Sequence, residues 1–257
     1  MARRATHRIR VLCVTAALLL TGCGQGHHLV IPSCTAQDVV LTTEQAENAA
    51  TIAAVGKRMG VANHGVTVAL ATAFQESGLR NLDYGDRDSL GLFQQRPSQG
   101  WGTAAEIRTP VLAAAEFYRH LVKVRGWQSL PITVAAQRVQ HSAAPDAYAQ
   151  WEDPARTLAK ALTGEVPAGI ACHYEPPKPP SRGPEPDLAL RAQAVRELGP
   201  GGLSRANVPS RAWVTASWLV THAKGYGLSR ISLSGQAWSA KRGTWVPDAT
   251  AHTLTWS

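Results

Sequence analysis

The segment from Gln75 to Pro97 holds the residues whose types and spacing point most clearly to chemistry. Glu76 falls at the C-terminal end of an apolar helical stretch, next to Phe74 and Leu79. Burial raises the pKa of a carboxyl group, and the carbonyl end of a helix also disfavours the anion. Both effects favour a protonated acid near neutral pH, the form that can protonate a glycosidic oxygen. Taken alone, a glutamate at a helix end is more often a solvated surface residue.

Two short motifs around Glu76 favour the chemical role. Glu-Ser-x-Leu-x-Asn begins at Glu76, and Gly-Leu-Phe-Gln begins at Gly91. The pair resembles the soluble lytic transglycosylase and goose-type lysozyme superfamily, in which a Glu-Ser that closes a helix precedes Gly-Leu-Met-Gln. Phe93 stands here in place of the methionine. The continuation to Gly102 resembles an actinobacterial cell-wall lipoprotein branch, and the match extends over residues 42–173.

The resemblance implies a mainly α, lysozyme-like domain that cleaves the glycan backbone of peptidoglycan. Glu76 would protonate the oxygen that links N-acetylmuramic acid to N-acetylglucosamine, and the substrate's acetamido group would stabilise the cation. Glu76 would then remove a proton from the muramyl 6-hydroxyl, as in a lytic transglycosylase, or from water, as in a lysozyme. The glycan strands are the expected partner, and no cofactor is expected.

A second carboxylate is usual in glycoside hydrolysis. Asp83, Asp86 and Asp88 lie near Glu76 in the sequence and could hold a water molecule. Aspartate is also common in turns, so a solvated or loop-capping role is the alternative for each. Their spacing is not that of an EF-hand loop, and we expect no metal site.

The same resemblance supplies candidate substrate-binding residues. Ser89 and Gln94 match motif positions that hydrogen-bond the glycan in the family. Tyr84, Phe93 and Trp101 offer flat faces for sugar rings, with core or loop packing as the alternative.

Residues 135–142 fall where the family has an Ala-Tyr-Asn-Ala-Gly helix start. The tyrosine of that element is absent, and Val139 and Gln140 stand nearby. Gln140 is a candidate polar contact in its place. The departure leaves open a glycan-binding protein that does not cleave.

Helical patterns position these residues. Thr42 and Gln45 form a capping box that opens a helix, and Gly60 can close it. A second helix is expected from His64 to about Ser77. Further helices are expected over residues 109–121, 131–140 and 147–162, the last disturbed by Pro154. The polar segment 81–103 has no periodicity, and loops of that length are usually functional.

The N-terminus predicts export. Four arginines precede the short apolar stretch 11–22, which has the form of a secretory signal. The stretch ends in Leu-Thr-Gly followed by Cys23, which resembles a bacterial lipobox, with a chance match as the alternative. We therefore predict a lipoprotein signal peptide over residues 1–22, a lipid on Cys23 and a tether over residues 23–41. The protein would be anchored to the outer face of the cytoplasmic membrane, facing the cell wall.

The remaining cysteines fit an oxidising compartment. Cys13 leaves with the signal, and Cys34 and Cys172 most simply pair with each other. In the chain-entropy model, closing so long a loop contributes at most roughly 5 kcal/mol. Two free thiols or a metal pair are the alternatives, although no closely spaced Cys/His set suggests zinc.

Residues 174–187 contain six of the chain's 16 prolines and predict a semi-rigid linker. A small α+β domain is expected over residues 188–257, with helices over 188–198 and 210–224 and then short strands. Five of the eight tryptophans lie there. Most are expected in the core of this unit, with stacking on a wall polymer as the alternative.

Composition excludes one class of protein and gives no support to another. The formal net charge is +8, but without the four N-terminal arginines 22 basic side chains face 18 acidic ones, a net charge of +4. That value does not argue for nucleic acid. No later stretch approaches the roughly 20 apolar residues of a membrane span, which excludes an integral transporter. His27 and His28 suggest a metal-handling lipoprotein as a weaker rival, without a cluster to support it.

Overall fold

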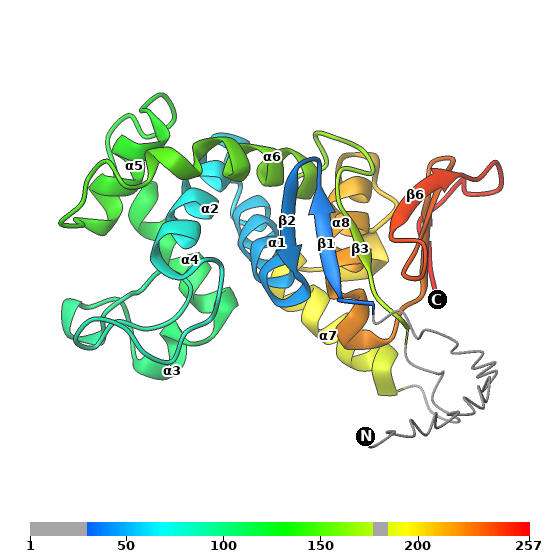
Figure 1. Ribbon diagram of the computed structural model, residues 1–257, viewed down its shortest axis with the longest axis horizontal. Coiled ribbons are helices and arrows are strands. Elements are labelled where there is room, and N and C mark those ends of the chain that lie inside the picture. Colours follow the sequence, from blue (N-terminus) through cyan, green and yellow to red (C-terminus); the bar gives the residue numbers. More distant parts are fainter. Residues whose placement is uncertain (1–29, 177–184) are drawn as a thin grey trace, which may run out of the picture.

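The computed structural model describes residues 30–176 and 185–257, so the predicted signal peptide and Cys23 lie outside the described residues. The fold is mixed α+β, with helices and two small antiparallel sheets. The helices are α1 (Thr43–Arg58), α2 (Asn63–Ser77), α3 (Ala104–Ile107), α4 (Pro110–Leu121), α5 (Ile132–Gln140), α6 (Glu152–Leu162), α7 (Glu185–Leu198) and α8 (Pro209–Tyr226). None of them is both long and apolar enough to cross a membrane. The helical end with α3 and α5 and the C-terminal strands lie at opposite ends of the molecule (Figure 1).

The helix ends next to Glu76 follow the sequence signals. The capping box of α1 is confirmed, since the Gln45 N–H donates to Thr42 Oγ1 at 3.2 Å and the Thr42 N–H donates to Gln45 Oε1 at 2.9 Å. Helix α2 ends at Ser77 and is capped by Gly78, whose φ of 62° is left-handed. Glycine adopts this conformation without a steric penalty, which fixes where α2 ends.

Two later helices differ from the prediction. A short 3₁₀ turn (Ala149–Trp151) precedes α6, which begins only at Glu152. Pro154 therefore lies in the first turn of α6, where its missing N–H has no intrahelical partner to lose. Helix α3 was not predicted, although Thr103 and Glu106 form a capping box at its start.

The first sheet corrects the predicted tether. Strands β1 (Ser33–Ala36), β2 (Val39–Thr42) and β3 (Ala171–His173) pair in the order β2-β1-β3. Residues 33–41, expected to be part of a tether, thus form a hairpin. Its side chains alternate between the core and solvent along β1.

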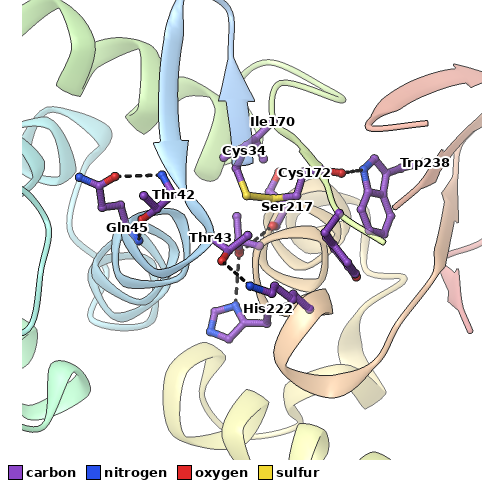
Figure 2. Close-up of a disulfide and its surroundings, with 12 residues drawn as sticks. Cys34, Thr42, Thr43, Gln45, Ile170, Cys172, Ser217, His222 and Trp238 are labelled. Carbon is purple, nitrogen blue, oxygen red and sulfur yellow. Dashed lines mark hydrogen bonds between the residues drawn. A yellow bond between two sulfur atoms is a disulfide. The ribbon is translucent and has the colours of Figure 1, made fainter. Parts of the chain in front are cut away.

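The predicted disulfide is confirmed. Cys34 and Cys172 lie directly opposite each other in the β1–β3 pair and are joined by a bond between their Sγ atoms (Figure 2). The Trp238 Nε1–H donates to the Cys172 carbonyl at 3.0 Å. The disulfide therefore joins the N-terminal hairpin to the strand against which the C-terminal unit packs.

The C-terminal unit shares its core with the rest of the chain. Strands β4 (Arg230–Leu233), β5 (Gln236–Ser239), β6 (Thr244–Pro247) and β7 (Thr255–Trp256) form a sheet in the order β6-β5-β4-β7. Trp218 and Trp238 are fully buried, as expected for core residues. The core is nevertheless one continuous cluster from α1 to β5, so the fold does not divide into two separate cores at the Pro-rich segment. Residues 177–184 of that segment lie outside the described residues.

Candidate active site

Helix α1 holds the end of α2 on which Glu76 sits. The Gln45 Nε2–H donates to the Gly78 carbonyl at 2.8 Å, and the Asn48 Nδ2–H donates to the Leu79 carbonyl at 2.9 Å. Both bonds reach backbone groups just after the last turn of α2. Glu76 itself is half-buried. A half-buried acid on a fixed helix end can be both protonated and presented to a ligand.

The two sequence motifs meet at this point. The Gly91–Gln94 turn closes a bridge between Leu90 and Gln95, and the Ser77 Oγ lies 2.7 Å from the Leu92 carbonyl oxygen. Gly91 has a φ of 73°, and a Cβ there would lie 2.5 Å from the Ile107 carbonyl oxygen. A larger residue at position 91 would therefore both strain the turn and collide with the backbone. The serine after Glu76 thus anchors the second motif to α2.

A tyrosine that the sequence analysis missed contacts the acid. The buried Tyr148 hydroxyl donates to Glu76 Oε1 at 2.7 Å. The following 3₁₀ turn is fixed to α2, because the Trp151 Nε1–H donates to Gln75 Oε1 at 2.8 Å and the Trp151 ring stacks on Phe74. The resemblance places the family's tyrosine within residues 135–142, whereas Tyr148 lies in the connection that follows α5. The contact between Tyr148 and Glu76 is hard to predict from the sequence, because it depends on a turn that hydrophobic periodicity does not define.

The surroundings of Glu76 raise its pKa and so favour its protonated form. Burial raises the pKa of Glu76, and hydrogen bonds from Tyr148 and Gln140 lower it by less. Burial and the charge of Glu76 raise the pKa of Tyr148, which keeps its phenol protonated as a donor. The Gln140 Nε2–H also donates to the Phe93 carbonyl at 2.8 Å. Gln140 therefore links α5, the second motif and the acid.

A pocket lies beside Glu76, with a cavity volume of about 450 Å³. Two of its lining residues act on the acid and on its tyrosine: Gln140 lowers the pKa of Glu76, and Ser142 lowers the pKa of Tyr148. We call this space the α5 pocket, and the residues that line it include Gln94, Arg96, Trp101, His120, Arg138, Gln140, His141 and Ser142. Glu76 does not itself line this pocket, and Gln140 is the lining residue that connects the pocket to the acid.

The other predicted binding residues differ in whether they line the α5 pocket. Gln94 and Trp101 line the α5 pocket, with one face of the Trp101 ring covered by His120 at a centroid distance of 4.1 Å. Tyr84 is 64% exposed and does not line the pocket. Ser89 is 7% exposed, and Phe93 is fully buried.

Burial corrects the expectation for Phe93. Its ring stacks on Phe117 at a centroid distance of 4.6 Å inside the core. The ring therefore has no face to offer a sugar, and the phenylalanine that replaces methionine serves packing. Ser89 is likewise buried, and neither side chain lines the α5 pocket.

The three loop aspartates do not meet Glu76. Asp88 accepts from Arg96 Nε and from the Ser98 N–H, each at 2.8 Å, and these bonds hold its pKa well below the usual range. It braces the loop as an anion. Asp83 and Asp86 are exposed. None of the three contributes to the pKa of Glu76.

Neither family models nor curated proteins give a match to this chain. Within the described residues, no group of three His, Cys, Asp or Glu side chains is placed to hold a metal ion. What the site does must therefore be argued from its own geometry.

Replacing Tyr148 with phenylalanine should shift the pH profile of any reaction that uses Glu76 as an acid. The variant loses the 2.7 Å bond that lowers the pKa of Glu76, so that pKa should rise. Activity that requires the protonated acid would then persist to higher pH. Its maximum should fall roughly fivefold to tenfold, because one hydrogen bond that orients the carboxyl contributes about 1 kcal/mol. The measurement is the initial rate across pH, and an unchanged profile would show that Tyr148 only fills space.

Proposed function

We propose that the protein cleaves the bond between N-acetylmuramic acid and N-acetylglucosamine in peptidoglycan, with Glu76 as the single acid and base. The observation that carries the proposal is a half-buried carboxyl with a raised pKa, hydrogen-bonded by Tyr148 and connected to the α5 pocket through Gln140. A protonated glutamate in such a setting is suited to protonate a leaving sugar oxygen. The meeting of Glu76-Ser77 with the Gly91–Gln94 turn supports the proposed lysozyme-like architecture.

The contacts of Glu76 suggest a different role for each of its two carboxyl oxygens. Tyr148 donates to Oε1, so the acidic proton sits on Oε2 and can be given to the glycosidic oxygen. The acetamido group of the substrate then stabilises the cation. The carboxylate left on Glu76 removes a proton from the muramyl 6-hydroxyl or from water. Proton transfer of this kind contributes roughly 10²–10⁴-fold to the rate.

A single-glutamate mechanism fits the surroundings better than a pair of carboxylates. Hydrolysis with two carboxyl groups needs them about 5–10 Å apart across the scissile bond. Asp88 is instead held by Arg96 and Ser98. The substrate's own acetamido group is therefore the proposed second participant.

The proposed location is the outer face of the cytoplasmic membrane, with a lipid on Cys23. A disulfide between Cys34 and Cys172 supports export, because such bonds persist in oxidising compartments. The membrane would then be a partner only through the lipid anchor, and nucleic acid is not a proposed partner.

The test is digestion of purified peptidoglycan sacculi by the full mature protein. We expect soluble muropeptides, and mass spectrometry of their ends separates the two outcomes: 1,6-anhydro ends indicate a lytic transglycosylase and hydrolysed ends a lysozyme. Cosedimentation of the protein with the sacculi is measured in the same samples. Binding without release would replace this proposal with that of a noncatalytic wall-binding protein.

A further inference from the structure

The charges that line the α5 pocket are not balanced. Arg96 is paired with Asp88 at 2.8 Å, and His120 Nε2 lies 3.2 Å from Glu116 Oε1. These two groups therefore have anionic partners within the protein. Asp86, also in the lining, lies 3.9 Å from Arg87.

Arg138 differs from these groups. It lines the pocket and is exposed, and no Asp or Glu in the described part of the chain forms an ion pair with it. His141, three residues on, lines the same wall. A cation with several N–H donors that faces a cavity and has no ion-pair partner among the described residues favours an anionic ligand there, even though Asp86 also lines the pocket.

Arg138 lies on the same helix as Gln140, the pocket residue that acts on Glu76. Arg138 and Gln140 lie in the last turn of α5, and His141 caps the helix with a left-handed φ of 52°. Gln140 contacts Glu76 and bonds the Phe93 carbonyl. Arg138, Gln140 and His141 all line the same pocket, so a saccharide that extends from Glu76 past Gln140 into the pocket would come within reach of Arg138.

We propose that Arg138, assisted by His141, binds a carboxylate of the glycan and makes this pocket selective for acidic over neutral strands. The proposal rests on the proposed function, because it concerns the same site. A guanidinium can hold a carboxylate with two parallel N–H···O bonds, a geometry that lysine does not reproduce. N-acetylmuramic acid carries a lactyl carboxylate, which is free when no peptide is attached, and an attached peptide brings carboxylates of its own.

The experiment uses soluble oligosaccharides of alternating N-acetylglucosamine and N-acetylmuramic acid. One set has free lactyl carboxylates, a second has them converted to amides, and a third carries the peptide. Affinity is measured with the Glu76→Gln variant, so that the ligand stays intact, and cleavage is measured with the wild type. We expect the free acid or the peptide form to bind about tenfold to a hundredfold more tightly than the amide, as hydrogen bonds to charged groups imply. Which acidic form binds better identifies the source of the carboxylate.

Variants test whether Arg138 causes the preference for the acidic ligand over the amide. Arg138→Ala in the same background should abolish the preference and leave affinity for the amide unchanged, and Arg138→Lys should retain part of it. Arg242→Ala, which removes the same charge from the exposed turn before β6, should behave as the parent. Melting temperatures check that each variant folds.

The outcomes separate this proposal from the proposed function. Equal affinity of the parent for acid and amide, or an equal loss on both ligands in Arg138→Ala, would overturn the carboxylate site. Failure of the wild type to cleave any oligosaccharide or sacculus would overturn the enzymatic proposal instead. In that case the binding preference still decides whether Arg138 recognises a carboxylate.

Discussion

Glu76→Gln should reduce the release of muropeptides from sacculi by about 10²-fold or more. Glutamine has nearly the same shape as glutamic acid and can still accept the Tyr148 hydrogen bond, but it cannot donate an acidic proton to the leaving oxygen. The wild type should in turn lose activity as the pH rises through the raised pKa of Glu76, since only the protonated form acts as the acid. Release is measured as soluble muropeptide per unit time.

The chain offers a matched control for this variant. Burial also raises the pKa of Glu47, which lies in a different pocket, beside Glu197. Glu47→Gln removes another carboxyl with a raised pKa, one that is exposed and does not line the α5 pocket, and it should leave release unchanged. If Glu76→Gln released fragments as fast as Glu47→Gln, Glu76 would not be the acid.

Local signals in the sequence were sufficient to predict the start of α1 and the end of α2, on which Glu76 lies. A capping box at Thr42 and Gln45 and a left-handed glycine at the end of α2 are set by residues only a few positions apart. The disulfide between Cys34 and Cys172 could be predicted from the export signal and from the number of cysteines left in the mature chain. The capping box, the left-handed glycine and the disulfide each depend on only one or two residues, and the types of those residues determine the local structure.

Contacts between distant segments could not be predicted in the same way. Tyr148 reaches Glu76 through a turn whose path depends on Trp151 packing on Phe74. The burial of Phe93 depends on Phe117 in α4. A pattern of residue types shows that such rings are apolar, but not which neighbour covers them. The predicted tether was wrong in its second half because β1 is stabilised by pairing with β3, which lies far along the chain.

Glu197→Ala should lower the free energy of unfolding by about 3–5 kcal/mol, the cost of removing one partner of a buried ion pair. Glu197 is 1% exposed, and its Oε2 lies 3.4 Å from His222 Nε2. The same oxygen accepts from Trp218 Nε1 at 2.7 Å and from Thr51 Oγ1 at 3.0 Å. The variant would leave these donors buried without an acceptor. Urea denaturation measures the change.

A control on the same helix separates burial from charge. Asp187 and Arg191 in α7 also form an ion pair, with both side chains about half exposed. Asp187→Ala should therefore cost less than about 1 kcal/mol. Equal destabilisation by the two variants would mean that the buried cluster contributes no more than a surface pair.

The pH dependence of stability tests the charges of the buried pair. Burial alone would raise the pKa of Glu197, but the charge of His222 and the hydrogen bonds to Glu197 lower it, so its stabilisation is lost as the pH falls through the folded-state value. Burial alone would lower the pKa of His222, but Glu197 raises it, so that contribution is lost as the pH rises through its folded-state value. The pair should stabilise most between these two values, and Glu197→Ala should flatten the profile.

The cluster also connects the C-terminal unit to the candidate site. Thr51 belongs to α1, Glu197 to α7 and His222 to α8, so the buried pair fastens both C-terminal helices to α1. Gln45 and Asn48 of the same α1 hold the end of α2 that carries Glu76. Loosening of α1 in Glu197→Ala should therefore lower muropeptide release below that of Asp187→Ala at temperatures where both variants are still folded. Equal rates in the two folded variants would show that α1 keeps its place without the C-terminal helices.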